Sequence, residues 1–146
     1  MKLYAESSAV LSWLFREPMG AEASRLLRSA SLIFASELTL LECDRALRAA
    51  EARGRLDGAG ARTVRAWLDE ARATWNVYRI GAVIMGRARR TFPCEPVRAL
   101  DALHLATALH VAEFERDLTV LTFDRRIRSN AAALGLEVAP AHPESD

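Results

Sequence analysis

The most constraining feature of the sequence is a regular alternation of short apolar segments with longer segments of helical periodicity. The short segments have the length and residue types of buried strands, and the longer ones repeat apolar residues three and four positions apart. This alternation predicts an α/β fold in which helices cover both faces of a mostly parallel sheet. We expect strands at residues 2–5, 31–36, 76–80, 118–123 and 136–140, and helices at 7–15, 21–28, 37–53, 59–75, 82–91, 99–114 and 125–134.

Local signals refine three of these helices. The helices at 37–53 and 59–75 are separated by a short segment, which predicts an antiparallel helical hairpin. Gly54 stands where a glycine commonly ends a helix. Ser7 or Ser8 is placed to cap the helix that follows the first strand.

Length and composition predict one globular domain over residues 1–146, with a loose tail from about residue 140. Hydrophobic residues make up 51% and charged residues 27% of the chain, as in ordinary globular proteins. No apolar run approaches the ~18 residues of a spanning helix, and Glu6 interrupts the first one, so we expect a cytoplasmic protein without membrane contact. Cys43 and Cys94 form no paired motif, and we expect buried free thiols.

Two acidic residues are expected at the ends of strands. Glu6 follows the first strand, and Asp124 follows the apolar segment 118–123. Ligands of open parallel sheets bind beyond the carboxyl ends of the strands, so both acids are candidates for chemistry. The structural alternatives are that Glu6 simply closes a strand and that Asp124 caps the next helix.

Two further acids lie in helices. Glu42 flanks the apolar stripe of helix 37–53 and leans toward the protein, unless it only pairs with Arg45. Asp101 stands near the start of helix 99–114, where a cap or first-turn acid is the structural alternative. Four carboxylates in one cleft repel one another, a repulsion that a divalent cation relieves, and oxygen ligands suit magnesium or manganese. For His104, three residues after Asp101, we expect a hydrogen-bonded or solvated role rather than metal ligation.

No nucleophilic triad and no glycine-rich phosphate loop is visible. Four further segments, in order, are informative: "LYAESSAVLSWLFREP", "SELTLLECDRAL", "RALDALHLATAL" and "VLTFDRRIRSNAAALGL". Together they resemble the PIN-domain ribonucleases and specifically the small VapC-type toxins of type II toxin–antitoxin modules. The resemblance covers nearly the whole chain, and the third and fourth segments are its most specific parts. It implies a three-layer α/β/α PIN-like fold with a central, mostly parallel sheet of four to five short strands and a long helical hairpin.

The resemblance also implies an active site and a reaction. The reaction is hydrolysis of RNA phosphodiester bonds by an endoribonuclease that depends on Mg²⁺ or Mn²⁺. The family's first acid is most often aspartate, whereas this chain has the longer Glu6. The implied catalytic and metal-binding residues are Glu6, Glu42, Asp101 and Asp124, with Thr122 and Ser7 in support.

Arginines close to these acids are candidates for contacts with RNA phosphates. Arg125, Arg126 and Arg128 follow Asp124 directly, and Arg98 precedes Asp101. The alternative for the run after Asp124 is an ordinary solvated helix face.

The resemblance further implies a homodimer and a small cognate antitoxin that covers the acidic groove. A second hypothesis remains open, in which the chain is a non-catalytic PIN-like binding module. In that case the replacement of aspartate by Glu6 has abolished metal binding, and the chain retains only partner binding.

Overall fold

Five parallel strands form a single sheet at the centre of the chain, in the order β3-β2-β1-β4-β5. The computed structural model describes residues 1–141, so the predicted tail lies outside the described residues from residue 142 onward. Parallel pairing throughout agrees with the expected class of sheet. The strands are β1 (Lys2–Ala5), β2 (Leu32–Ser36), β3 (Asn76–Tyr78), β4 (Leu118–Leu121) and β5 (Glu137–Ala139).

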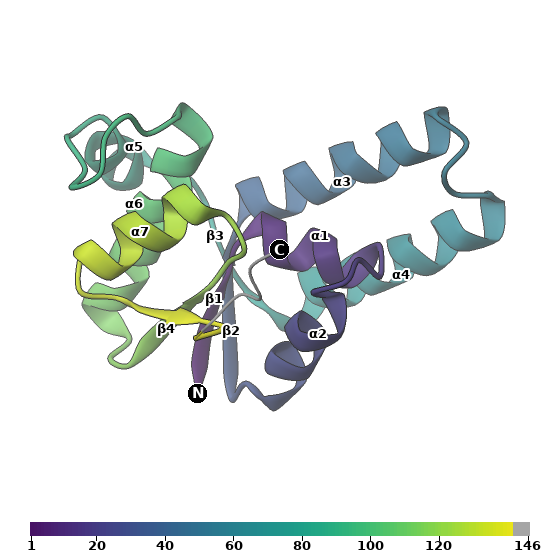
Figure 1. Cartoon of the computed structure of the whole chain (residues 1–146), viewed down its shortest axis with the longest axis horizontal. Helices are drawn as coiled ribbons and strands as arrows, with labels where there is room; N and C mark the ends of the chain where they lie inside the picture. The colour runs from purple at the N-terminus through teal and green to yellow at the C-terminus, as the bar shows by residue number, and fades with distance from the viewer. Residues whose placement is uncertain (142–146) are drawn as a thin grey trace.

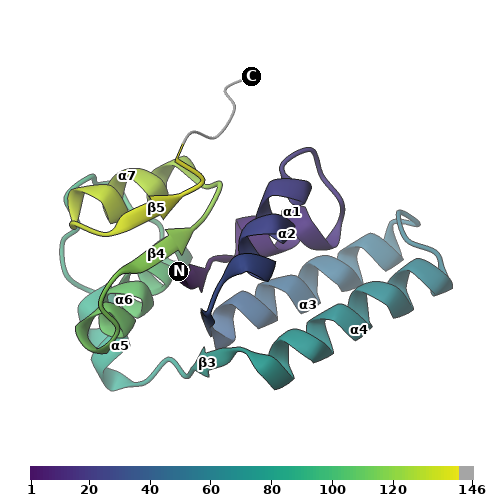
Figure 2. The same cartoon turned by 90° about the horizontal axis from the view of Figure 1, so that it is seen from below.

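Helices cover both faces of this sheet, which gives the predicted three-layer α/β/α architecture. Helices α1 to α4 lie on one side, and α5 to α7 lie on the other (Figures 1 and 2). Within residues 1–141, no helix combines the length and the apolar character needed to cross a membrane. The helices are α1 (Ser7–Leu14), α2 (Gly20–Ser29), α3 (Glu37–Ala52), α4 (Gly58–Thr74), α5 (Ala82–Ala88), α6 (Ala99–Phe114) and α7 (Arg125–Ala133).

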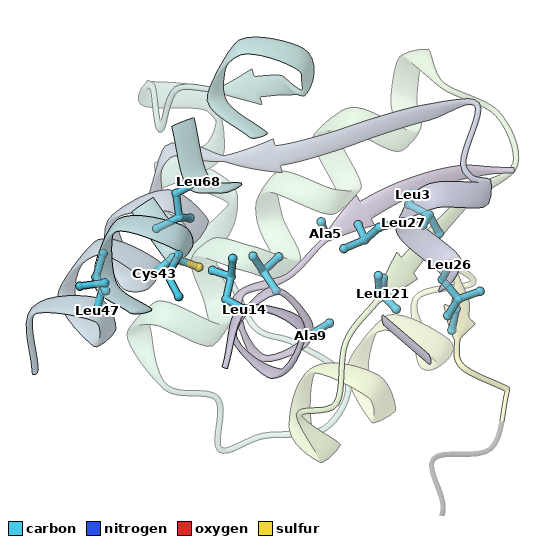
Figure 3. Packing of buried hydrophobic residues seen from close by; sticks show 14 residues of the cluster. Leu3, Ala5, Ala9, Leu14, Leu26, Leu27, Cys43, Leu47, Leu68 and Leu121 are labelled. Atoms are coloured by element: carbon cyan, nitrogen blue, oxygen red, sulfur yellow. The ribbon is translucent and has the colours of Figure 1, made fainter. Parts of the chain in front are cut away.

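The strands alternate their side chains between two cores, as the period of a β-strand requires. Leu3 and Ala5 of β1 pack with Leu121 of β4 in the core beneath α1 to α4 (Figure 3). Tyr4 and Val120 point to the opposite face and pack beneath α6 and α7. Because both faces of β1 and β4 are buried, these two strands form the centre of the molecule.

The predicted helical hairpin is present. Helices α3 and α4 run antiparallel and extend away from the sheet as an arm (Figure 1). Gly54 has a φ of 67°, the left-handed conformation expected of a glycine just past a helix end. Asp57 caps α4 by accepting a hydrogen bond of 2.7 Å from the amide of Gly60.

Several local predictions are wrong. The cap of α1 is Glu6 rather than Ser7 or Ser8, because the carboxylate accepts the amide of Ser8 at 3.1 Å. Cys43 is buried as expected, but Cys94 is exposed. Helix α5 ends at Ala88 rather than residue 91. Strand β4 ends at Leu121 rather than residue 123, because residues 122–124 form the turn that leads to the cap of α7.

Candidate functional site

The carboxyl ends of β1 and β4 bring the first acid and its hydroxyl neighbour together. The two strands pair in register from Lys2 to Ala5, so Glu6 and Thr122 emerge side by side. The amide of Glu6 donates to the carbonyl of Leu121 at 3.0 Å, which continues the ladder. The Thr122 hydroxyl donates to Glu6 Oε2 at 2.6 Å.

Glu6 is 2% exposed, and hydrogen bonds surround its carboxylate. Oε1 accepts from the Ser7 hydroxyl at 2.7 Å and from the Ser8 amide, and Oε2 accepts from the hydroxyls of Ser8 and Thr122. Four donors match the roughly four lone-pair positions of a carboxylate. The charge of Glu6 is therefore fully satisfied by the chain itself, which is what allows it to be buried.

Glu42 reaches the same region from α3 and contacts a buried histidine of α6. His104 is 1% exposed, and its Nε2 lies 2.6 Å from Glu42 Oε2 and 3.8 Å from Glu6 Oε1. Burial opposes the ionisation of Glu42, but the hydrogen bond that His104 donates to its carboxylate outweighs this cost. The net effect holds the pKa of the Glu42 carboxyl below its ordinary value.

Tyr4 fixes the other side of the same imidazole. Its hydroxyl lies 3.0 Å from His104 Nδ1, and both side chains are buried. Burial, with the charge of Glu6 in addition, raises the pKa of Tyr4, so the phenol keeps its proton and donates to Nδ1. This network assigns the histidine proton to Nε2, from which it is donated to Glu42. Tyr4, His104 and Glu42 thus form a chain of hydrogen bonds from the core to the edge of the sheet.

Asp101 and Asp124 form the second half of the site, on either side of one guanidinium. Arg98 Nε donates to Asp101 Oδ2 at 3.2 Å, and its Nη2 lies 3.9 Å from Asp124 Oδ2. Asp124 also caps α7, accepting the amides of Arg126 and Ile127 through Oδ1. Asp101 is in the first turn of α6 and does not cap it.

Thr122 connects the two halves. Its hydroxyl donates to Glu6 and accepts the amide of Asp124 at 3.1 Å. Within residues 1–141, the one group of carboxylate and imidazole atoms close enough to share a metal ion is Glu6, Glu42 and His104. The predicted set of four acids is therefore arranged as two neighbouring groups. His104 is hydrogen-bonded as expected, but its place in this compact group, as a possible metal ligand, was not predicted.

The arginines near the site differ in how their side chains are used. Arg128 donates to the carbonyls of Thr122, Ala139 and Pro140 at 2.9, 3.3 and 2.7 Å, and thereby ties β4 and β5 together. Partial burial lowers the pKa of Arg128. By contrast, Arg125 and Arg126 are exposed at the start of α7. Arg128 thus has a structural role, which the sequence could not separate from the others.

Sequence reasoning missed Tyr4 and Ser8 as members of the site. Ser8 donates to Glu6 and accepts the amide of Phe123 at 2.9 Å, which fixes the loop after β4. The paired serines after Glu6 are the signal that marks this role. Tyr4 carried no such signal, because a tyrosine in a strand is usually a core residue.

The three-layer fold, with acids at the carboxyl edge of a parallel sheet, is that of an α/β protein with a candidate acidic site, and comparison with known proteins identifies the family. The PIN domain model matches residues 3–133. Ribonuclease VapC45 of Mycobacterium tuberculosis is 33% identical over 140 residues, which cover 95% of each chain. The chain therefore belongs to the PIN-domain family, and within it to the VapC type.

Solved structures support the same fold at lower sequence identity. VapBC2 from Rickettsia felis, bound to a DNA fragment from their promoter, has a TM-score of 0.62 at 13% identity and covers 94% of this chain and 97% of its own. FitAcB from Neisseria gonorrhoeae has a TM-score of 0.65 at 18% identity, with coverage of 94% and 96%. At these identities the likeness establishes the fold alone.

Proposed function

We propose that the chain is a metal-dependent endoribonuclease and the toxin component of a toxin–antitoxin module. The observation that carries the proposal is the set of four acids gathered at the carboxyl edge of the sheet, with Thr122 joining their two halves. The similarity to Ribonuclease VapC45 supports RNA as the substrate. The absence of a nucleophilic triad in the sequence agrees with hydrolysis by water rather than through a covalent intermediate.

The donor set fits Mg²⁺ or Mn²⁺. Glu42, Asp101 and Asp124 offer carboxylate oxygens at the edge of the sheet, and hard oxygen ligands suit these ions. Glu6 is buried among four donors of the chain, and it would become a ligand by releasing one of its hydroxyl donors. When bound, the metal would lower the pKa of a water molecule and neutralise charge on the phosphate. Without a metal, other side chains position these carboxylates. His104 orients Glu42 through a hydrogen bond, and Arg98 lies between Asp101 and Asp124.

The rim of the site offers positive charge for an RNA backbone. Arg98, Arg125 and Arg126 are the residues we assign to phosphate contacts, because each has an exposed side chain close to Asp124. Arg128 is left out of this set, since its guanidinium is engaged with three carbonyls.

Two protein partners belong to the proposal. VapBC2 from Rickettsia felis, bound to a DNA fragment from their promoter, supports a small antitoxin as the partner of this chain. We also propose that two copies of the chain associate as a homodimer and that the protein acts in the cytoplasm. An antitoxin that covers the acidic groove would block both metal and RNA.

The second candidate function is a non-catalytic PIN-like binding module. The observation in its favour is that four donors from the chain already occupy the lone-pair positions of Glu6. If Glu6 cannot release any of them, the metal site has lost one of its four acids and partner binding remains.

A nuclease assay separates the two functions. Partner-free protein is incubated with transfer and ribosomal RNAs in Mn²⁺ and in chelator. We expect cleavage that disappears in chelator and in Asp101→Ala, but persists in the control Asp69→Ala, an exposed acid of α4. Intact RNA throughout, from protein that is folded by circular dichroism, would favour the binding module.

Substitutions of Glu6 then test its place in the site. Retained or increased cleavage by Glu6→Asp, together with loss in Glu6→Ala, supports a ligand role. Unchanged cleavage by a folded Glu6→Ala protein would show that the remaining acids suffice.

A further inference from the structure

His104 converts a pair of carboxylates into a mixed nitrogen and oxygen donor set. Its Nε2 faces Glu42 Oε2 at 2.6 Å and Glu6 Oε1 at 3.8 Å, and one donor atom from each residue lies within 4.8 Å of the other two. No other three His, Cys, Asp or Glu side chains among residues 1–141 come this close. Imidazole nitrogen suits Zn²⁺ and other late transition metals, whereas purely carboxylate sites suit Mg²⁺ and Mn²⁺. This part of the site therefore favours a different ion from the one proposed above.

The spacing of the three donor atoms is close to that around a tetrahedral zinc ion. Zinc bonds of about 2.0–2.2 Å at tetrahedral angles place the ligand atoms about 3.3–3.6 Å apart. The gap between His104 Nε2 and Glu6 Oε1 is slightly wider, and that between Nε2 and Glu42 Oε2 is narrower, because a hydrogen bond joins them. The Glu42 side chain is 25% exposed, so it can move outward and leaves an ion a path from solvent. The Ser7 hydroxyl donates to Glu6 Oε1 at 2.7 Å and frees this oxygen by rotating about a single bond.

Tyr4 gives His104 the support that a metal-binding histidine needs on its second nitrogen. Such histidines donate the other ring N–H to an oxygen, which fixes the tautomer and the ring orientation. The Tyr4 hydroxyl lies 3.0 Å from Nδ1 and donates to it in the network described above. With an ion on Nε2, exchange with solvent moves the imidazole proton from Nε2 to Nδ1, and the phenol oxygen accepts it. The phenol then donates to one of the neighbouring hydroxyls of Ser36, Thr39 and Thr107. The imidazole thus changes tautomer without changing its charge.

We propose that Glu6, Glu42 and His104 bind Zn²⁺, with a water molecule as the fourth ligand, and that this ion inhibits the nuclease. Three protein ligands and one water molecule are a common zinc coordination. An ion held here engages Glu6 and Glu42, so neither carboxylate is available to the ion that Asp101 and Asp124 bind. The inhibition rests on the proposed function, whereas the binding of zinc does not.

Visible absorption of Co²⁺ tests the donor set without any nuclease measurement. Co²⁺ replaces Zn²⁺ in protein sites, and it absorbs much more strongly when four-coordinate than when six-coordinate. We expect strong bands in wild-type protein, their loss when Zn²⁺ is added, and their absence in His104→Gln. His110→Gln is the matched control, because His110 is a second histidine of α6 and belongs to no such group within residues 1–141. Weak bands in wild-type protein, or unchanged bands in folded His104→Gln, would overturn the zinc site.

Calorimetry compares the affinities of the protein for the two kinds of ion. His104→Gln should lower the affinity for Zn²⁺ at least about tenfold and that for Mg²⁺ less than about threefold, because only zinc uses the imidazole. Cys94→Ser removes an exposed thiol that could also bind zinc, and it should leave both affinities unchanged. Equal losses for the two ions in His104→Gln would overturn the proposal, since they would show a purely structural role.

Two further variants decide the question where His104→Gln fails to fold. Tyr4→Phe removes the oxygen that accepts from Nδ1 and should weaken zinc binding by about 10–100-fold, the usual effect of losing such a partner. Glu42→Gln removes one ligand at a half-buried position and should weaken zinc binding at least as much. An unchanged zinc affinity in folded Glu42→Gln or Tyr4→Phe would contradict the proposed coordination.

Inhibition is measured separately, as RNA cleavage in Mg²⁺ with increasing Zn²⁺, each protein relative to its own rate without zinc. We expect Zn²⁺ to stop cleavage by wild-type protein, and His104→Gln to need at least about tenfold more Zn²⁺ for the same effect. Zinc binding by a protein that never cleaves RNA contradicts the proposed function alone. An active protein that binds no zinc contradicts the zinc site alone, and cleavage that persists with zinc bound contradicts the inhibition.

Discussion

The two carboxylate oxygens of Glu6 have different structural roles. The side chain folds back far enough for Oε1 to cap its own helix at the amide of Ser8, while Oε2 reaches across to Thr122 on the neighbouring strand end. The same group thus helps to begin α1 and to join β1 to the loop after β4. Its burial follows from these bonds, because an ionised carboxylate without them would be too costly to bury.

The lowered pKa of Glu42 predicts a pH-dependent contribution to stability. Because the folded-state pKa lies below the unfolded one, the contribution is present above the unfolded pKa and is lost as pH falls through the folded pKa. In chelator, the stability difference between wild-type protein and Glu42→Gln should be largest near neutral pH and shrink in acid. Urea unfolding at several pH values measures it.

The matched control for this titration is Glu70→Gln, at an exposed position of α4. It should change stability by less than about 0.5 kcal/mol at every pH. A stability difference for Glu42→Gln that stays constant from neutral to acid pH would contradict the contribution of the His104 hydrogen bond.

Arg98 is expected to compete with the metal. Its guanidinium contacts Asp101 and approaches Asp124, so a cation that binds both acids has to displace it. The Arg98 side chain is 66% exposed. Exposed ion pairs contribute about 0.2–1 kcal/mol to stability, so displacing Arg98 lowers the affinity for the metal by at most about fivefold. Arg98→Gln should therefore bind Mn²⁺ up to about fivefold more tightly, as measured by calorimetry, and cleave RNA more slowly at saturating metal.

Arg125→Gln controls for the general loss of positive charge near the site. We expect it to leave Mn²⁺ affinity within about twofold, since no acid of the site contacts its side chain within residues 1–141. Equal Mn²⁺ affinities for Arg98→Gln and wild-type protein would show that the guanidinium moves away at no cost.

At the scale of elements, the joint between α1 and α2 depends on a glycine. A Cβ at Gly20 would lie 2.3 Å from the carbonyl oxygen of Ser12, a backbone atom that cannot rotate away. Gly20→Ala should therefore destabilise the protein by about 1–3 kcal/mol, the usual cost of overpacking, in chemical denaturation.

Gly58→Ala is the control, because its Cβ would meet only Arg62 Nη1, at 3.4 Å. It should stay within about 0.5 kcal/mol of wild type. Equal stabilities of the two alanine variants would mean that α2 shifts freely relative to α1.

Elements and their order could be predicted from the sequence, whereas the contacts between them could not. Alternation of apolar segments and helical periodicity identified every strand and helix, and strand ends pointed to Glu6 and Asp124. The contact of Tyr4 with His104 joins residues 100 positions apart, so it depends on how α6 docks on the sheet. The structural use of Arg128 likewise depends on three carbonyls that only the folded chain brings together.

At the scale of the whole molecule, the chain consists of a sheet covered on both faces and an arm of two helices. β1 and β4 are buried on both faces, while the distal end of the arm around Gly54 is exposed. Side chains of both arm helices hold the arm to the body, since Cys43 of α3 and Leu68 of α4 lie in the same core as Leu14 of α1. Trp67 stacks on Trp13 of α1 with centroids 5.9 Å apart and planes inclined by 20°.

Because the arm extends away from the sheet and its distal end is exposed, we expect α4 to open independently of the sheet. Regions with few buried contacts exchange their amides through local opening, whereas central strands exchange only through global unfolding. In hydrogen exchange we expect residues 53–57 to be the least protected part of the arm and β1 and β4 to be the most protected strands. Trp67→Ala should speed exchange in α4 by at least about tenfold, since loss of a stacked aromatic pair costs about 0.5–1.5 kcal/mol beyond its buried area.

The pattern of the change, more than its size, decides whether the arm is a separate unit. If α4 opens locally, Trp67→Ala accelerates exchange in α4 by a larger factor than in β1 and β4, whose amides respond only to the change in global stability. An equal factor in the arm and in the central strands would show that α4 and the sheet unfold together. In that case the stack of Trp13 on Trp67 would stabilise the whole fold rather than the attachment of the arm.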